Sequence, residues 1–379
     1  MDFELTEDQR MIQRMARDFA QKEVLPHVAE WEENEALPRE IFRQMGEMGF
    51  FALPFPEEVG GLGAGYLSYV LAVEEISRVS ASLGISYAAH VSIGTFPIHL
   101  FGSPEQKDRW LGPLLRGEFL AAFGLTEPNA GSDAGATETT AVFRDGEWVL
   151  NGTKCFITNA NLAGVVVATA VTDPGRGSRG ISSFIVPTDA PGFSVGKKYA
   201  KLGLKASDTA ELIFEDCRLP ADALLGERNA GLRQFLTALD GGRISIAALS
   251  VGIAQACLDA SLPYAKTRVQ FGRPISSFQA VQFKLADMAM ETELARLMTY
   301  KAAWLKDSGR PFSREAAMAK LYASEVSVRA ALQAVQIHGG YGYMEEYPVE
   351  RYLRDAKLME IGEGTSEIHR LVIARSLGC

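Results

Sequence analysis

The spacing of apolar residues over the first hundred or so positions predicts helices. Thr6 and Gln9 form a capping-box pair, and apolar residues then recur at helical spacing up to Phe19. Residues 67–79 are apolar nearly all round, which predicts a buried helix. A second capping box, Ser103 with Gln106, is expected to open a helix that runs to residue 115. A shorter helix is predicted from the apolar residues Ile41, Phe42, Met45 and Met48.

From about residue 118 the pattern changes to short β runs separated by Gly, Pro and Asp. The runs cover residues 165–171, 181–186, 193–195 and 212–214. The dipeptides Asp145-Gly146 and Asn151-Gly152 are typical of two-residue turns, so both are expected to form tight hairpins. We therefore expect a compact all-β domain, either a barrel or a sandwich.

Helical spacing returns after Gly226 and persists over three long stretches, residues 232–266, 278–306 and 314–338. These lengths exceed the usual helix of about 10–14 residues and favour a packed bundle. The order α, β, α gives three expected domains: helical residues 1–118, β residues 119–228 and helical residues 229–379. A chain of 379 residues is long enough for two or three domains.

Composition and charge exclude several classes of protein. Hydrophobic residues make up 47% of the chain and charged residues 22%, as in a globular protein with a large core. The net charge of −9 argues against a general nucleic-acid binder. Residues 1–10 show no targeting pattern, and no run of about 18 apolar residues predicts a membrane span, so we expect a cytoplasmic protein.

The cysteines predict neither a disulfide framework nor a metal site. Cys155, Cys217 and Cys257 are far apart, contain no C-x-x-C pair and are expected to be small buried hydrophobes. Cys379 is expected to be a thiol in the tail. No metal is expected.

The strongest candidate for chemistry is Glu363, which has glycine on both sides. Gly362 and Gly364 allow a sharp turn and close approach of a ligand. Thr365 is a good N-cap for a following helix, whose free N–H groups would suit a phosphate. The alternative is a solvated glutamate in a glycine turn.

Three further stretches could bind a cofactor. Residues 123–133 form a turn rich in small residues and hydroxyls, fit for a flat polar ring or a phosphate, or simply a hairpin loop. Strand alternation puts Phe156 and Thr158 on one face, which suits a stacked ring, although a core Phe beside a satisfied Thr is the plain alternative. Arg268 and Arg273 flank a glycine between helices and suit a diphosphate, or are solvated charge.

Taken in order, these stretches resemble the acyl-CoA dehydrogenase family of flavoproteins. The resemblance rests on "LTEPNAGSD", "FITNA", "RVQFGRP", "QIHGGYGY" and "GEGTSEI", and covers essentially the whole chain. The short-chain and branched-chain branches look closest, through "LDGGRISIA" and "FQAVQFKLADM". The resemblance implies an α+β multidomain fold: an N-terminal helical domain, a middle β-barrel or sandwich, and a C-terminal four-helix bundle.

The same resemblance implies FAD and the residues that hold it. By analogy, the flavin would contact residues 123–133 and the stretch from Phe156 to Thr158. Most relatives carry tryptophan in place of Phe156. The adenine-dinucleotide part of an FAD bound mainly by a neighbouring subunit would contact the Arg268 loop and the residues before Tyr341. The implied cofactor residues are Phe123, Leu125, Thr126, Gly131, Ser132, Phe156, Ile157, Thr158, Arg268, Gln270, Phe271, Gln279, Gln336, Gly339, Gly340, Thr365 and Glu367.

For the substrate, the resemblance implies Ser132, Asp240, Arg243 and Gly364, and it makes Glu363 the catalytic base. Some branches take that base from an earlier helix, but the aligned positions here are Gly241 and Gly242. Burial would raise the pKa of the Glu363 carboxyl, whereas the helix start after Thr365 would lower it, so the net direction is open at this stage. The Glu363 N–H and a ribityl hydroxyl of FAD would stabilise the enolate.

The implied reaction is α,β-dehydrogenation of a short, medium or branched acyl-CoA to the trans-2-enoyl-CoA. An electron-transfer flavoprotein would accept the electrons, and the family implies a homo-oligomer, usually a tetramer. Ile85, Ser86 and Ala89 are candidates for the floor of the acyl pocket. Two alternatives stay open: an oxidase or flavin monooxygenase that uses O₂, and a non-catalytic DNA-binding flavoprotein. The net negative charge and the presence of Glu363 argue against the DNA-binding alternative.

Overall fold

The computed structural model describes residues 4–379; the first three of the ten residues assessed for a targeting pattern lie outside this range. Both predicted capping boxes are confirmed: Gln9 N–H donates to Thr6 Oγ1 at 3.2 Å and Gln106 N–H donates to Ser103 Oγ at 3.2 Å. Met48 was expected on a helix face, but α3 ends one residue earlier and Met48 is 38% exposed. The N-terminal helices are α1 (Glu7–Phe19), α2 (Val28–Glu33), α3 (Arg39–Glu47), α4 (Gly65–Val79), α5 (Ala81–Ala88), α6 (Phe96–Phe101) and α7 (Pro104–Leu115).

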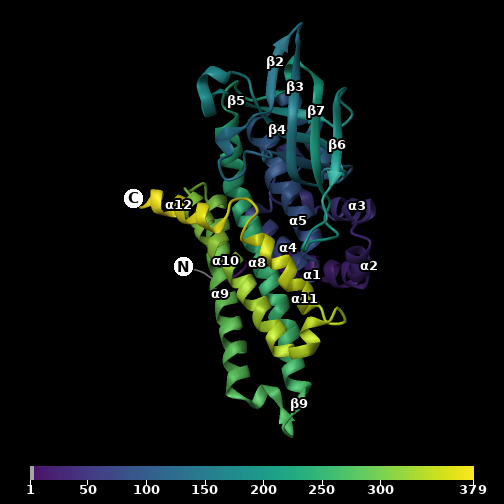
Figure 1. Ribbon diagram of the computed structural model, residues 1–379, viewed down its shortest axis with the longest axis vertical. Coiled ribbons are helices and arrows are strands. Elements are labelled where there is room, and N and C mark those ends of the chain that lie inside the picture. Colours follow the sequence, from purple (N-terminus) through teal and green to yellow (C-terminus); the bar gives the residue numbers. More distant parts are fainter. Residues whose placement is uncertain (1–3) are drawn as a thin grey trace.

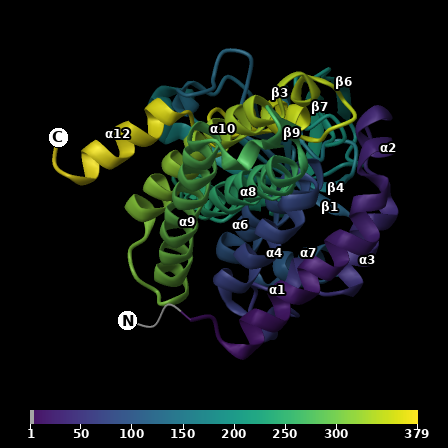
Figure 2. The ribbon, with the colours of Figure 1, turned by 90° about the horizontal axis from the view of Figure 1, so that it is seen from below.

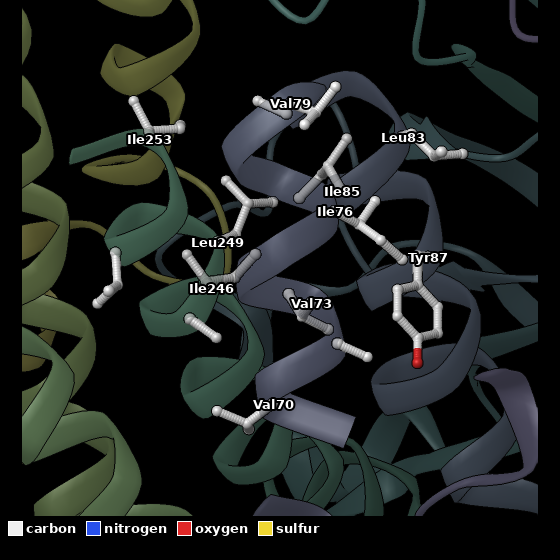
Figure 3. Close-up of a cluster of buried hydrophobic side chains, with 14 of the residues drawn as sticks. Val70, Val73, Ile76, Val79, Leu83, Ile85, Tyr87, Ile246, Leu249 and Ile253 are labelled. Atoms are coloured by element: carbon white, nitrogen blue, oxygen red, sulfur yellow. The ribbon is translucent and has the colours of Figure 1, made fainter. Parts of the chain in front are cut away.

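Helix α4 lies at the centre of the helical core. Nearly every residue from Tyr66 to Val79 is buried, as its uniformly apolar sequence predicts. Figure 3 shows α4 beside α8 (Gly231–Thr267), with Val73 and Ile76 of α4 near Ile246 and Leu249 of α8. Full burial of each such side chain stabilises the fold by about 1.5–3 kcal/mol. The N-terminal helices and the C-terminal bundle therefore share one hydrophobic core.

The middle of the chain forms one eight-stranded sheet with the order β6-β7-β3-β2-β4-β5-β8, and β1 pairs with β4. The two halves of the sheet enclose a common core, in which Trp148 of β3 meets Phe184 of β5 with ring centroids 5.1 Å apart. The strands are β1 (Leu120–Gly124), β2 (Thr140–Arg144), β3 (Glu147–Thr158), β4 (Ala163–Val171), β5 (Ile181–Pro187), β6 (Phe193–Lys198), β7 (Thr209–Pro220) and β8 (Leu224–Leu225).

Of the two predicted hairpins, the first is confirmed and the second is wrong. Asp145 and Gly146 join β2 to β3, but Asn151 and Gly152 lie inside β3. There Asn151 lies in a bulge, because the pairing of β3 with β7 shifts register between Leu150 and Gly152. Asn151 also accepts a hydrogen bond from the Asp216 N–H at 2.8 Å. Long-range pairing thus overrides the local turn preference of the dipeptide.

Long helices build the C-terminal bundle, and the three predicted stretches match α8, α9 and α10 to within two residues. Helix α8 is long and apolar enough to span a membrane, but 78% of its most apolar window is buried inside the protein, so it is the core helix. The β9–β10 ribbon (Val269–Gln270 and Arg273–Pro274) lies at the end of the molecule opposite the sheet, and α12 projects from the body in both views (Figures 1 and 2). The remaining helices are α9 (Gln279–Asp307), α10 (Ser313–His338), α11 (Val349–Met359) and α12 (Ser366–Ser376).

Candidate active site

Residues 362–364 form a tight turn, hereafter the 362–364 turn, between α11 and α12. The Gly362 N–H donates to the Leu358 carbonyl at 2.9 Å, which closes the end of α11. Glu363 has φ +53° and Gly364 has φ +103°, so the backbone reverses within two residues. Thr365 is the N-cap of α12, as predicted, and its hydroxyl accepts from the Ile368 N–H at 3.4 Å. The turn therefore presents Glu363 sideways, toward α8.

Glu363 is half-buried as a residue, and its carboxylate atom Oε2 is buried against the bare backbone of Gly242. Its Oε2 atom is inaccessible to solvent and has no hydrogen-bond partner among residues 4–379. A Cβ on Gly242 would lie 2.1 Å from this oxygen and 2.9 Å from Cγ2 of Ile93, so any side chain at position 242 would force the carboxylate to move. Burial raises the pKa of Glu363 to about 7, and the charges of Lys320 and Arg243 partly offset the rise. Near neutral pH the group can therefore accept a proton.

Two buried cationic side chains, Lys320 and Arg243, act on the Glu363 carboxylate of this turn. Lys320 of α10 donates to the Gly364 carbonyl at 2.6 Å. Arg243 of α8 is 7% exposed and forms an ion pair with Asp240 one helical turn earlier. Burial, with smaller contributions from Lys320 and Arg243, lowers the pKa of His369 in α12 to about 3, so its imidazole is neutral. These groups surround the carboxylate with net positive charge.

The N-terminal helices close the other side of the site. The Tyr66 hydroxyl of α4 donates to the Gly241 carbonyl at 2.8 Å and lies 3.1 Å from Ser245 Oγ. Its ring packs against Tyr69 with centroids 5.1 Å apart. Burial raises the pKa of both tyrosines, so they face the carboxylate as neutral groups. The acidic group therefore lies between α4, α8 and α10, away from bulk water.

A fully buried ion pair shapes the residue 123–133 turn. Lys154 of β3 donates to Glu127 Oε1 at 2.6 Å and to Thr169 Oγ1 at 3.0 Å. Glu127 also accepts from the backbone N–H groups of Glu138 and Thr139. Because Thr126 accepts from the Cys155 N–H at 2.9 Å, the turn is fixed to β3 at two successive residues. Such a turn is rigid enough to hold a flat ligand.

Phe156 is held out from β3 in an unusual conformation. Its φ of +59° is left-handed, its side chain is 64% exposed, and its ring centroid lies 5.0 Å from that of Tyr199. Ile157 is buried and Thr158 is half-buried, but the pairing of β3 with β7 shifts register between Lys154 and Ile157, so the strand is irregular at Phe156. An exposed aromatic ring fixed by local strain suits stacking on another ring, so this surface fits a flavin.

The start of the 123–133 turn packs against α8, the helix that contacts Glu363. Phe123 stacks on Phe235 of α8 with ring centroids 4.2 Å apart. Leu125 belongs to the same buried cluster as Phe235 and Ile93, and Ile93 reaches Gly242. Gly131 and Ser132, by contrast, are exposed. The structure thus connects this turn with the carboxylate through α8 and Ile93.

A second group of expected cofactor residues lies far from Glu363 along the bundle. The β9–β10 ribbon, which directly follows Arg268 in the chain, is at the end opposite the sheet (Figure 1). Phe271 is 94% exposed, and the Arg268 guanidinium lies 5.5 Å from the Tyr341 ring centroid. The structure does not bring this group to Glu363 within one chain. Its exposed members are Arg268, Gln270, Phe271, Gln279, Gln336, Gly339 and Gly340, whereas Thr365 and Glu367 lie beside the 362–364 turn.

Sequence reasoning gave no role to Lys320, His369, Tyr66 or Lys154. Lys320 had a visible signal, because it falls on the helix face formed by the buried residues Ala316, Ala319 and Ala323. A lysine on an apolar helix face predicts a buried partner. The role of Tyr66 depends on contact with a helix some 175 residues later, which no local pattern contains.

A buried carboxylate of raised pKa and an exposed aromatic surface that a flat cofactor could meet are both features that suit an oxidoreductase. The chain belongs to the acyl-CoA dehydrogenase family, whose members are flavin-dependent oxidoreductases. Its N-terminal domain model matches residues 6–118, its middle domain model residues 122–217 and its C-terminal domain model residues 229–378.

Individual relatives match over the whole chain. The probable acyl-CoA dehydrogenase YngJ of Bacillus subtilis (strain 168) is 60% identical over 378 residues and covers 100% of both chains. The structure of butyryl-CoA dehydrogenase from Megasphaera elsdenii superposes with a TM-score of 0.98 at 45% identity and covers 100% of both chains. A chain from a study of the electron transferring flavoprotein of Acidaminococcus fermentans has a TM-score of 0.98 at 50% identity, covering 100% of this chain and 99% of that one.

Proposed function

We propose that the protein is an FAD-dependent acyl-CoA dehydrogenase that converts a short, medium or branched acyl-CoA to the trans-2-enoyl-CoA, with Glu363 as the base. The observation that carries this proposal is the Glu363 carboxylate buried against Gly242, with a pKa raised to about 7. A carboxylate of ordinary pKa would be a weaker base toward the α-proton of a thioester.

Each residue of the proposed site has its own role in the reaction. Glu363 takes the α-proton onto Oε2, and the electrons of that C–H bond move toward the thioester carbonyl as the β-hydride leaves. The Glu363 N–H has no acceptor among residues 4–379 and can donate to the developing enolate oxygen. Ile93 and Tyr66 exclude water from the carboxylate. A bound flavin supplies the two-electron acceptor for the hydride.

The proposed FAD site consists of residues whose side chains suit a flavin and its phosphates. Phe156 offers the exposed ring face, and Thr158 and Thr126 offer polar groups beside it. The phosphates would meet the N-terminus of α12 at Thr365. The substrate would pass Ser132, Asp240, Arg243 and Gly364, and the Asp240–Arg243 ion pair on α8 would hold two of these groups together.

We propose a homo-oligomer, with a tetramer as the family's usual form. Helix α9 carries an exposed apolar stripe at helical spacing: Phe283, Met290, Leu294 and Leu297. A second copy on this stripe would also bring the exposed ribbon residues Arg268 and Phe271 to a neighbour's FAD. The cytoplasmic placement and an electron-transfer flavoprotein as acceptor complete the proposal; the match to a chain studied with such a flavoprotein supports the latter.

The deciding experiment is anaerobic reduction of the bound flavin by a panel of straight and branched acyl-CoAs. We expect bleaching of the yellow enzyme by a short acyl-CoA, and reoxidation by an artificial acceptor without peroxide. Peroxide formed at the rate of turnover would favour the oxidase alternative. Protein that is colourless and cannot be reconstituted with FAD would contradict the proposal.

A further inference from the structure

Burying the charged side chain of Lys320 in the core costs free energy of folding. It lies on the core face of α10 among alanines and is fully buried. Within residues 4–379 its ammonium has one hydrogen-bond acceptor, the Gly364 carbonyl at 2.6 Å. Burial lowers the pKa of Lys320 to about 8, and the negative charge of Glu363 opposes this effect. A buried cation with one neutral acceptor destabilises a fold, so its place here points to a role in the 362–364 turn.

The turn that Lys320 contacts is strained. Glu363 is a non-glycine residue with φ +53°, a conformation that costs of the order of 1–3 kcal/mol. The Gly364 carbonyl, which accepts from Lys320, follows directly. On the α12 side, Nε2 of His369 lies 3.2 Å from where a Cβ of Gly364 would be. The turn is thus held between α10 and α12, and Lys320 supplies its hydrogen bond from the core.

Lys320 is also the main positive charge acting on the Glu363 carboxylate. Arg243 of α8 contributes less and is already paired with Asp240. The groups that face the carboxylate from the other elements carry no charge near neutral pH: Tyr66 and Tyr69 of α4 and His369 of α12. Without Lys320, the ionised carboxylate would lose most of the charge that offsets its burial.

We propose that Lys320 is a positioning residue for the dehydrogenation: it fixes the 362–364 turn through the Gly364 carbonyl and keeps the Glu363 carboxylate ionised. This inference rests on the proposed function of Glu363 as the base. Lys320 itself does not contact the reacting carbon atoms; it acts through the turn and through its charge.

The test is the pH profile of kcat/KM for Lys320→Met, which keeps the length of the side chain and removes its charge. We expect the acidic limb to move up by about one pH unit or more, so that activity at pH 6 falls about tenfold further than at pH 9. Single-turnover bleaching of the flavin should show the same shift. Lys201→Met is a matched control: burial also lowers the pKa of Lys201 to about 8, and Lys201 also donates to a backbone carbonyl, that of Ser207. We expect its acidic limb to stay in place.

A second substitution separates charge from folding. Lys320→Gln keeps an N–H donor without the charge, and we expect it to show the same shift of the limb, whereas Lys320→Arg should restore the limb toward the wild-type position. An active Lys320→Met or Lys320→Gln enzyme whose acidic limb is unchanged, with activity lowered equally at every pH, would overturn the proposal. A wild-type enzyme that no acyl-CoA bleaches would contradict the proposed function instead.

Discussion

Gly242 of α8 and Glu363 are in direct contact: a Cβ added at position 242 would lie 2.1 Å from the buried Oε2 atom. Real Cβ atoms do not approach an oxygen so closely, so the missing side chain at 242 is a requirement of the carboxylate at 363. The neighbouring Gly241 points elsewhere, since its Cβ would lie 3.2 Å from the Tyr66 hydroxyl. The pair of glycines therefore offers a substitution and its own control.

We expect Gly242→Ala to lose most dehydrogenase activity while the protein stays folded. In a helix interior, alanine is favoured over glycine by roughly 0.5–1 kcal/mol, so the helix itself is not weakened. The added methyl group would displace Glu363 from its position, and a displacement of about 1 Å can cost a hundredfold in rate. The measurement is kcat at saturating substrate, with flavin content and melting temperature recorded beside it.

Gly241→Ala should retain much more activity than Gly242→Ala, because its methyl group meets Tyr66 and not the carboxylate. Equal losses in the two variants would contradict a specific contact between residues 242 and 363.

The pH dependence of the reaction should follow Glu363. Its pKa is raised to about 7, and the base acts only when ionised, so kcat/KM should fall about tenfold per unit below pH 7. Glu363→Gln should keep bound FAD, lose most dehydrogenation and show no such limb. The measurement is kcat/KM from pH 5 to pH 9 with an artificial acceptor. Turnover at the wild-type level in Glu363→Gln would rule out this base.

Much of this fold was predictable because its signals are local. The capping boxes at Thr6 and Ser103 and the periodicity of α8 to α10 each depend on residues within one element. The Asn151-Gly152 prediction was wrong because β7 pairs across the dipeptide, and β7 lies some 60 residues away. Pairing between distant strands decides such cases, and the sequence of a dipeptide does not indicate that pairing.

The site was predictable to a smaller extent. The glycines around Glu363 could be read locally, but the direction of its pKa shift required the contact with α8 and the count of charges around it. Desolvation raises the pKa of Glu363 by more than the charges of Lys320 and Arg243 lower it, and only distances and burial reveal this balance. Lys320 and Arg243 are 77 positions apart in the sequence numbering, yet both act on one carboxylate.

The buried Glu127–Lys154 ion pair should be important for stability and flavin binding. Lys154→Met would leave the Glu127 carboxylate buried without its cation, which typically costs about 3–5 kcal/mol. Because Glu127 also orders the backbone N–H groups of Glu138 and Thr139, FAD content should fall as well. Urea unfolding and the ratio of flavin to protein absorbance measure both effects.

The double variant Glu127→Gln/Lys154→Met is the control for this pair. It removes both charges, so it should be less destabilised than Lys154→Met alone. A double variant that is destabilised by the sum of the single effects would show that the two side chains act independently.

Asp355 of α11 should destabilise the protein above neutral pH. It is fully buried, accepts from the Leu204 N–H at 2.6 Å, and burial together with the charge of Glu32 raises its pKa from 3.8 to about 7. A raised carboxyl pKa means that the cost of ionisation appears as the pH rises from about 4 to about 7. Asp355→Asn should therefore stabilise the protein by a few kcal/mol at pH 8, at about 1.4 kcal/mol per pKa unit, and much less at pH 4.5.

Urea unfolding at the two pH values measures this difference. Glu32→Gln, which removes the neighbouring charge, should reduce the gain from Asp355→Asn. A gain that is the same at both pH values would contradict an electrostatic origin.

Arg268 should matter for FAD only in the assembled protein. It is exposed at the end of the bundle opposite the sheet, with its guanidinium over the Tyr341 ring, and it is far from Glu363 in its own chain (Figure 1). If it binds the diphosphate of a neighbour's FAD, Arg268→Ala should lower FAD affinity about tenfold or more, since a charge-assisted hydrogen bond is worth about 1.5–3 kcal/mol. Flavin titration and light scattering would give the affinity and the oligomer mass.

The matched control for that variant is Arg109→Ala, because the Arg109 guanidinium also lies over an aromatic ring, 4.7 Å from the Trp110 centroid, but in α7 of the N-terminal helices. We expect it to leave both flavin content and mass unchanged. Because the proposed contact joins two subunits, dilution that dissociates the oligomer should release FAD from the wild-type protein too. Full flavin retention by Arg268→Ala at unchanged mass would remove Arg268 from the cofactor site, and full retention by isolated wild-type monomers would show that each chain holds its FAD alone.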